Sequence, residues 1–382
     1  MRLTLFLTFC SFVNTQAIYN GFNIFPFNST ALAMPDTLNS LKTIALLGGK
    51  WIGVNYFLRQ SNATSNDIHF ESRTPTNDVW ATFIQEAHKN NLKVLLKPLV
   101  VCGGECLFIN IVPENITNWF SSYEQIIYNI SIMAEELKVD ALSVGLELLQ
   151  ISNYTSNWKS VIQTIRNGSY KGLLTYCSIF YPVETQHIGF WDELDFIGMD
   201  FYLPLLNITQ NGSIPSQQNM TDRFSHYFQF FKTWFDAQPA NVTSKSVVLT
   251  EVGYPSSLAG MANPSANPAD VCVGNSSASF ALQDMAYAAL FQALDNNKGL
   301  VDGSIIFWWD NPSTSDYYNS RDSNDWGCSW TVRGKPAECT IANAFGGICP
   351  MSKSDSLYHH SGILIALKLF FGFLFLFLSV KN

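Results

Sequence analysis

The chain has 382 residues, of which 47% are hydrophobic, and its formal net charge at pH 7 is −8. A chain of this length can bury a large apolar core, in one large domain or two small ones. Its acidity, without basic clusters, argues against a nucleic-acid partner and fits a neutral polymer better than a polyanion as the ligand.

Residues 1–17 have the pattern of a secretory signal peptide. Arg2 precedes the apolar run Leu3–Val13, and residues 15–17 end in the small Ala17 that a signal peptidase accepts. We therefore expect a secreted protein whose mature chain begins near Ile18. The alternative is an uncleaved anchor, but the run is too short to cross a bilayer.

Residues 351–382 resemble a signal for a glycosylphosphatidylinositol anchor. Three serines between 352 and 356 are followed by a polar spacer at 357–362 and by the apolar run Ile363–Val380, which only Lys368 interrupts. We expect this tail to be replaced by a lipid, which would hold the protein at the cell surface. The competing interpretation is a retained hydrophobic segment that spans the membrane.

Many Asn-x-Ser/Thr sequons follow the predicted signal peptide, as in a glycosylated extracellular protein. Each site that is used must lie on the surface. The sequons begin at Asn28, Asn62, Asn115, Asn129, Asn153, Asn167, Asn207, Asn211, Asn219, Asn241 and Asn275.

The cysteine count is odd once the signal peptide is removed, because one of the eight cysteines lies within it. At least one thiol is then unpaired, and Cys177 is the candidate since it lies within a predicted strand. Cys102 and Cys106 could close a small disulfide loop, and Cys328 with Cys339 is a second plausible pair. A metal site at the CxxxC spacing fits an oxidising compartment less well.

Segments typical of strands and helices alternate along the chain from residue 18, which predicts a parallel sheet built from βα units. The predicted strands are Phe22–Phe25, Trp51–Phe57, Leu92–Leu96, Ala141–Glu147, Leu173–Ser178, Phe196–Asp200, Val247–Glu251 and Gly303–Trp309. The predicted helices are Leu38–Leu47, Asn77–Asn90, Phe120–Leu137, Trp158–Arg166, a short one near Trp191, Phe224–Phe235 and Phe280–Asn296.

Eight strands with interleaved helices predict an α/β fold, a (β/α)₈ TIM barrel. We expect it to form a single domain over residues 18–310 and to be followed by a Cys-containing extension over residues 311–350 that wraps the barrel. The phenylalanine stripe within Phe224–Phe235 has helical spacing and is typical of core. We expect the domain to be a monomer.

Two of the predicted strands end in a glutamate, Glu147 and Glu251. The carboxyl ends of barrel strands carry the chemistry in this fold. Two carboxylates that meet there are the minimum equipment for cleaving a glycosidic bond with retention, with Glu147 as the acid/base and Glu251 as the nucleophile. The alternative is that either glutamate is only a solvated residue at a strand end.

Aromatic residues near these strand ends are candidates for binding a sugar. Tyr202 follows the sixth strand and could orient the nucleophile with its hydroxyl, although beside Pro204 it could equally be a packing residue. Trp308 and Trp309 end the last strand, and alternation directs one of them to the barrel mouth. We expect that one to be a stacking platform for a pyranose and the other to be core.

Four further polar residues are candidates for contacts with substrate hydroxyls. No His, Cys and carboxylate cluster calls for a catalytic metal, and we expect no cofactor. The four candidates are Lys97, Asn55, Tyr56 and Asp200.

Four motifs in the same order resemble glycoside hydrolase family 113, a group of retaining (β/α)₈ enzymes. They are VLLKP at Val94–Pro98, SVGLEL around Glu147, FWDELDFIGMDFYLPL at Phe190–Leu205 and LTEVGYP around Glu251, within about residues 20 to 310. The resemblance implies endo-hydrolysis of a mannan-type β-1,4-linked polysaccharide, and it also implies Glu147 as acid/base and Glu251 as nucleophile.

Two positions depart from the pattern of the family and its clan. Leu146 stands where the clan usually has an asparagine that contacts the sugar 2-hydroxyl, and Leu99 lies where the family often has a histidine. Cleavage of another β-glycan, such as glucan or xylan, therefore stays open. So do a cell-surface carbohydrate-binding protein without turnover and a structural glycoprotein without a sugar site.

Overall fold

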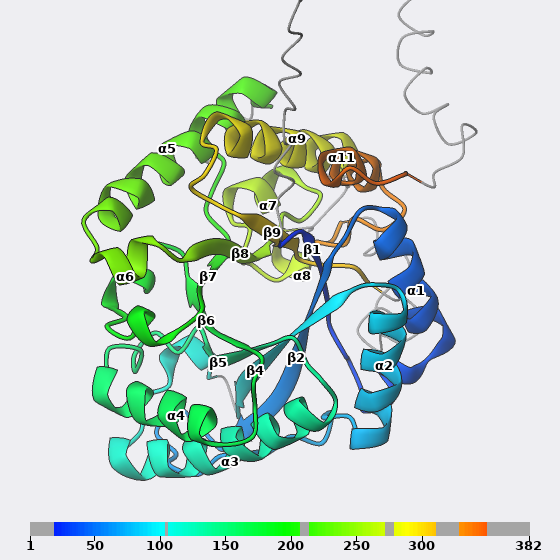
Figure 1. Cartoon of the computed structure of the whole chain (residues 1–382). Coiled ribbons are helices and arrows are strands. Elements are labelled where there is room, and N and C mark those ends of the chain that lie inside the picture. Colours follow the sequence, from blue (N-terminus) through cyan, green and yellow to red (C-terminus); the bar gives the residue numbers. More distant parts are fainter. Residues whose placement is uncertain (1–18, 104–105, 207–213, 272–278, 311–327, 350–382) are drawn as a thin grey trace, which may run out of the picture.

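The computed structural model describes residues 19–103, 106–206, 214–271, 279–310 and 328–349. Eight parallel strands form a closed barrel inside a ring of helices, because β1 pairs with both β2 and β9 (Figure 1). The prediction of a (β/α)₈ barrel is therefore confirmed. The barrel strands are β1 Gly21–Ile24, β2 Trp51–Gln60, β4 Lys93–Cys102, β5 Ala141–Leu146, β6 Leu173–Ile179, β7 Phe196–Phe201, β8 Ser246–Val252 and β9 Gly303–Ile306.

The ring of helices follows the chain around the barrel (Figure 1). Its long members are α1 Pro35–Leu46, α2 Asn77–Lys89, α3 Ile116–Glu136, α4 Thr155–Asn167, α5 Gln217–Asp236, α9 Phe280–Asn296 and α11 Pro336–Phe345. Short helices are η1 Ala31–Ala33, η2 Phe108–Asn110, η3 Thr185–His187, η4 Trp191–Glu193, α6 Ala240–Thr243, α7 Leu258–Ala262 and α8 Pro268–Val271. Between β6 and β7 only η3 and η4 occur.

Apolar side chains fill both faces of the strands, which is why the barrel strands read as apolar runs. One cluster fills the amino-terminal end of the barrel interior and contains Trp51, Leu95, Ala141, Phe196, Val248 and Ile305. The larger cluster lies between the strands and the helices, and the phenylalanine stripe of α5 is buried in it as predicted.

Two strands run further than predicted. The register of β2 with β4 is continuous from Trp51 and Lys93 to Gln60 and Cys102, whereas Lys97-Pro98 had suggested a strand end. A charged residue is tolerated within β4 because it has an ionic partner inside the barrel, described below. A short strand that was not predicted, β3 His69–Phe70, pairs antiparallel with the end of β2.

The Cys-containing segment that we predicted as an extension contributes α11 to the ring of helices, between α9 and α1 (Figure 1). Phe345 of α11 packs edge-on against Phe22 of β1 and Phe291 of α9, with ring centroids 5.7 Å apart in both pairs. After α11 the chain turns at Gly346, whose φ is +71°, and the Ile348 amide donates a hydrogen bond to Leu46. This end of the chain thus lies beside the amino-terminal end of the barrel.

The disulfides agree in part with the prediction. Cys102 and Cys106 are bonded and Cys177 is a buried free thiol, as expected. The pairing of Cys328 with Cys339 is wrong, because the turn after α11 brings Cys349 to Cys339, with their Cα atoms 4.9 Å apart. Cys328 is disulfide-bonded, to a different partner.

Several sequence features lie outside the described residues. They are the apolar runs 3–13 and 363–380 and the sequons at Asn207, Asn211 and Asn275. Across the ranges that the structure covers, no helix has both the length and the apolar character needed to cross a bilayer.

Candidate active site

Both glutamates lie at the carboxyl ends of barrel strands. Glu147 directly follows the last residue of β5, and Glu251 is the penultimate residue of β8. Because all barrel strands are parallel, these ends open on one face of the barrel. The backbone of Glu147 has φ +47°, in the left-handed region, and its amide donates a 2.9 Å hydrogen bond to the carbonyl of Cys177 on β6.

Each carboxylate oxygen of Glu251 has its own partner. Lys97 of β4 forms an ion pair with Oε1, and the Tyr202 hydroxyl donates a 2.6 Å hydrogen bond to Oε2. The Lys97 side chain is fully buried and that of Glu251 is 9% exposed. Two such partners hold the carboxylate in one orientation.

A polar layer lies beneath Glu251 inside the barrel. The Thr250 hydroxyl donates a 2.6 Å hydrogen bond to Oδ1 of Asp200, and the Asn23 amide donates to the Thr250 and Ile305 carbonyls. Burial and the charge of Glu251 raise the pKa of Asp200 well above its usual range. Asn23 and Thr250 were missed, although a polar residue inside a buried strand is a usable signal.

The balance of charges decides the protonation of Lys97. Burial alone lowers the pKa of Lys97, but the negative charges of Glu251 and Asp200 outweigh this effect, so that its pKa is raised and the ammonium stays charged. The buried ammonium of Lys97 therefore lies among several carboxyl groups at the barrel mouth.

The surroundings of Glu147 favour its protonated carboxyl group. Burial is the largest cause that raises the pKa of Glu147 well above its usual range, and the charges of Asp200, Glu251 and Glu184 add to it. Lys97 opposes them without cancelling them. Glu147, whose pKa is raised, and the Glu251 carboxylate that Lys97 and Tyr202 hold therefore lie in one electrostatic neighbourhood.

The two tryptophans lie on different sides of the strand end. Trp308 packs against Phe25 and Phe27, which follow β1 at the mouth, with centroid distances of 5.7 and 5.5 Å. Trp309 packs on the helix side against Phe22, and the Arg333 guanidinium lies 5.8 Å from its ring centroid. Trp308 thus lies among the aromatic residues at the mouth, and Trp309 lies in the core outside the strands.

Asn55 and Tyr56 are separated by the alternation of β2. Asn55 is in register with Lys97 inside the barrel, 2% exposed, and its Oδ1 has no hydrogen-bond donor among the described residues. Tyr56 instead stacks on Trp80 of α2 at 5.5 Å, where burial raises the pKa of Tyr56 to about 12. The structure therefore brings Asn55 near the carboxylates and does not bring Tyr56 there.

One wall of the mouth is apolar. It is formed by Phe57, Leu99, Leu146 and Cys177, from four neighbouring strands. Both leucines that depart from the family pattern lie in this apolar wall, and neither side chain can donate a hydrogen bond to a sugar hydroxyl. The two substitutions are visible in the sequence, whereas their place in one cluster arises only in the folded barrel.

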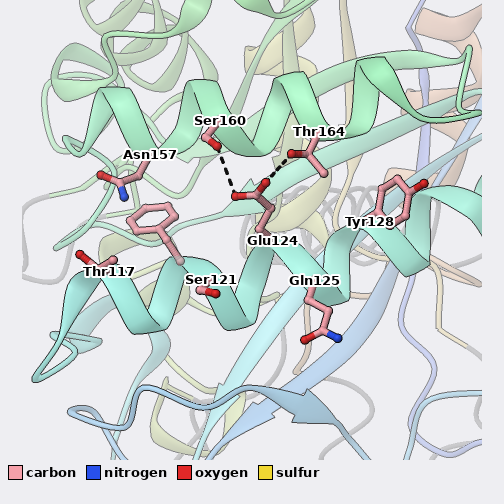
Figure 2. Close-up of a pocket in the computed structure, with 9 residues that line it drawn as sticks. Thr117, Ser121, Glu124, Gln125, Tyr128, Asn157, Ser160 and Thr164 are labelled. Atoms are coloured by element: carbon pink, nitrogen blue, oxygen red, sulfur yellow. Dashed lines mark hydrogen bonds between the residues drawn. The ribbon is translucent and has the colours of Figure 1, made fainter.

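A separate groove of about 540 Å³ lies on the outer ring between α3 and α4. Figure 2 shows its carboxylate, Glu124 of α3, accepting hydrogen bonds from the hydroxyls of Ser160 and Thr164 of α4. With one carboxylate already occupied, the groove lacks the pair that glycosidic cleavage needs. In the described part of the chain, no three His, Cys, Asp or Glu side chains gather as a metal site would require.

The model of Glycoside Hydrolase Family 113 matches residues 25–335, which is most of the chain. The chain belongs to glycoside hydrolase family 113. As a family 113 protein it is a glycosidase. None of the curated proteins compared with it matches.

Solved structures share the fold of this family 113 protein. A GH113 β-1,4-mannanase has TM-score 0.70 and 21% identity, covering 87% of this chain and 99% of the other. A GH113 β-mannanase from Alicyclobacillus acidocaldarius has TM-score 0.70 and 23% identity, covering 87% and 100%. The endo-β-1,4-mannanase from Thermotoga petrophila has TM-score 0.53 and 15% identity, covering 87% and 77%.

Proposed function

We propose that the protein is a retaining endo-β-glycosidase in which Glu251 is the nucleophile and Glu147 the acid/base. Glu251 attacks the anomeric carbon while the glycosidic bond breaks and the leaving oxygen takes the proton of Glu147. Glu147 then removes a proton from water, which attacks the same carbon and releases Glu251. The observation that carries this assignment is that Glu251 is held by Lys97 and Tyr202 beside a glutamate whose pKa is raised.

The neighbours of Glu251 have distinct roles in this proposal. Lys97 pairs with Oε1 and the Tyr202 hydroxyl donates to Oε2, so the carboxylate is held in one orientation while each oxygen keeps a further lone pair for attack on the sugar carbon. Trp308 and Phe25 offer aromatic faces on which a pyranose can stack. Asn55 and Asp200 have buried oxygens that can accept hydrogen bonds from sugar hydroxyls.

A mannan-type β-1,4-linked polysaccharide is the substrate that we propose. Support comes from family membership and from the β-1,4-mannanases among the solved structures of the same fold. Leu146 and Leu99 replace the polar residues that the family and its clan usually have at these positions, so recognition of the sugar hydroxyls at this apolar wall differs from theirs. Glucan and xylan are therefore tested beside mannan.

Purified protein incubated with mannan, glucan and xylan, followed by sizing of the products, tests the substrate and the endo action. We expect short oligosaccharides from mannan with the β configuration retained in NMR spectra. The Glu251→Gln protein should lack hydrolysis of all three polymers. Unchanged turnover of an activated aryl glycoside by Glu251→Gln would refute the assignment. Light scattering of the same sample tests the expected monomer.

We also propose a glycosylated protein held at the cell surface by a lipid. Eight of the eleven sequon asparagines lie within the described residues, and seven of them are exposed while Asn28 is partly exposed, which favours their use. Removing N-glycans enzymatically should lower the apparent mass. Release from cells by a phosphatidylinositol-specific phospholipase distinguishes the lipid anchor from a retained transmembrane segment, which the enzyme leaves in place.

The proposed anchor implies how the active site is oriented relative to the membrane. Ile348 donates a hydrogen bond to Leu46, whose loop leads into the amino-terminal end of β2. Glu147 and Glu251 lie at the opposite, carboxyl-terminal end of the barrel. A chain tethered after Cys349 would therefore present the proposed active site away from the membrane, towards extracellular polysaccharide.

A further inference from the structure

A second buried carboxylate lies behind the proposed acid/base. Glu184, on the loop between β6 and β7, has no exposed surface. Its Oε1 accepts a 2.7 Å hydrogen bond from the Tyr176 hydroxyl, and its Oε2 accepts one of the same length from the Ile179 amide. Burying a carboxylate is costly unless hydrogen-bond donors replace the water that it loses. The two donors to Glu184 fulfil this condition.

Tyr176 connects Glu184 to the residue that follows Glu147. Its hydroxyl oxygen accepts a 2.9 Å hydrogen bond from the amide of Leu148. The amide of Glu147 is bonded to the Cys177 carbonyl, so β6 holds the backbone on both sides of the Glu147 side chain. This backbone is left-handed, a conformation that a glutamate keeps only where its surroundings enforce it.

The residues around Tyr176 fix the orientation of its ring and therefore of its hydroxyl. Trp158 and Phe190 contact the ring edge-on, with centroids 5.4 and 5.6 Å away. A Cβ at Gly145 would come within 2.6 Å of the ring, so the glycine of the SVGLEL motif lets the tyrosine lie against β5. The ring is thereby fixed between β5 and the outer helices.

The same carboxylate acts on Glu147 through space. The groups that face Glu147 are Asp200, Glu251 and Glu184, which raise its pKa together with burial, and Lys97, which lowers it. Burial raises the pKa of Glu184 itself to about 7, so its negative charge is present on the alkaline side of neutrality. There a general acid is most at risk of losing its proton.

We propose that Glu184 and Tyr176 are positioning residues that aim the Glu147 carboxyl at the leaving oxygen and help it to remain protonated. Tyr176 supplies the geometric part through Leu148, and Glu184 fixes the tyrosine hydroxyl and supplies the charge. The inference rests on the proposed role of Glu147 as acid/base.

Two single substitutions separate these parts. Tyr176→Phe removes only the hydroxyl, and Glu184→Gln removes the charge together with one of the two acceptor oxygens. Tyr170→Phe is the matched control for the first, because it removes another buried hydroxyl that donates to a backbone carbonyl, that of Val139. Glu338→Gln is the control for the second, because Glu338 is 4% exposed, accepts a hydrogen bond from the Gly334 amide and is not among the groups that shift the pKa of Glu147.

With an alkyl β-glycoside, whose leaving group needs a proton, Tyr176→Phe should lower kcat/KM about 10-fold to 100-fold, within the range of general acid catalysis. With a dinitrophenyl β-glycoside it should change kcat/KM less than threefold, on the order of the controls. In Glu184→Gln the alkaline limb of the pH profile of kcat/KM should move to lower pH by about 0.5 to 1 unit.

Equal losses on both substrates, or a Tyr176→Phe protein that behaves like Tyr170→Phe, would overturn the geometric part. An alkaline limb unchanged in Glu184→Gln would overturn the charge part. Thermal melting shows whether each variant is folded. If either Tyr176→Phe or Glu184→Gln fails to fold, the other still tests its own part of the proposal. If Glu147→Gln itself shows no dependence on the leaving group, the proposed function fails; if only the Tyr176 and Glu184 variants lack their effects, this inference alone fails.

Discussion

Lys97 and Glu251 form an ion pair inside the barrel, and the lysine side chain has no contact with solvent. Two charges are taken out of water at this point, which is costly unless each compensates the other. Neither residue can therefore be replaced alone without leaving an isolated charge in a buried site. The pair explains why a lysine occupies the middle of an otherwise apolar strand.

Lys97→Met should lower both activity and stability. The variant leaves Glu251 and Asp200 buried together without the cation, and breaking a buried pair costs about 3 to 5 kcal/mol of unfolding free energy. We expect kcat/KM to fall at least about 100-fold, as for loss of a preorganised charge. Urea denaturation and steady-state kinetics measure the two effects. Lys93→Met, at the exposed start of the same strand, should leave both nearly unchanged; equal effects in the two variants would contradict the role of the ion pair.

Activity should fall at alkaline pH because Glu147 loses its proton there. Its pKa is raised by burial and by neighbouring carboxylates, so the protonated acid persists to higher pH than for an ordinary glutamate. Glu147→Gln should lower kcat/KM about 10²-fold to 10⁴-fold for poor leaving groups and remove the alkaline limb. A pH series with the wild type and this variant measures it. An alkaline limb that survives in the variant would assign the titration to another group.

Tyr202→Phe should slow the reaction while leaving the fold intact. The variant loses the hydrogen bond to Glu251 Oε2 but keeps the ring contact with Phe307. A hydrogen bond to a charged group contributes about 1.5 to 3 kcal/mol, which corresponds to roughly a 10-fold to 150-fold loss in kcat/KM. Tyr227→Phe, whose hydroxyl donates to the Pro204 carbonyl, is a control from outside the site. A Tyr202→Phe enzyme as active as this control would remove the orienting role.

The buried Lys335 should make the stability of the folded protein depend on pH, independently of catalysis. Burial lowers the pKa of Lys335 to about 7, although its Nζ donates to Ser256 and Ser329. Between pH 7 and about 10 the unfolded chain holds a proton on this lysine that the folded chain lacks, so stability rises with pH by up to about 1.4 kcal/mol per unit.

The difference in unfolding free energy between the wild type and Lys335→Met isolates this effect, because all other groups cancel. It should grow in favour of the wild type from pH 7 to pH 9 in denaturant titrations. Lys298, whose side chain is exposed, is substituted in the same way as the control for removing a surface lysine. A flat difference for Lys335→Met would mean that the lysine stays charged in the folded protein.

Cys177 should react with a thiol reagent only after unfolding. The thiol is fully buried in the apolar wall, and burial raises its pKa, so that the reactive thiolate is suppressed as well as inaccessible. Colorimetric thiol titration before and after adding denaturant measures this. Cys177→Ser should abolish the thiol that unfolding exposes, and rapid labelling of the folded wild type would contradict the burial.

The amino-acid sequence by itself determined the barrel and the two glutamates. Apolar runs with turn residues after them are local patterns, and a glutamate at the end of such a run can be located without any contact being known. The pattern does not show what lies opposite. Lys97-Pro98 therefore suggested the end of a strand, and Tyr56 was grouped with Asn55 although they point to opposite sides of β2.

Only the tertiary structure decided the partners of these residues. The ion pair of Lys97 with Glu251 joins positions 154 residues apart, and the pairing of Cys339 with Cys349 depends on the turn after α11. Glu184 follows no strand pattern, and its place behind Glu147 arises from the packing of β6 against β5. Local propensity selects elements, whereas ionisation and orientation depend on contacts between distant segments, so the protonation states of this site exist only in the folded barrel.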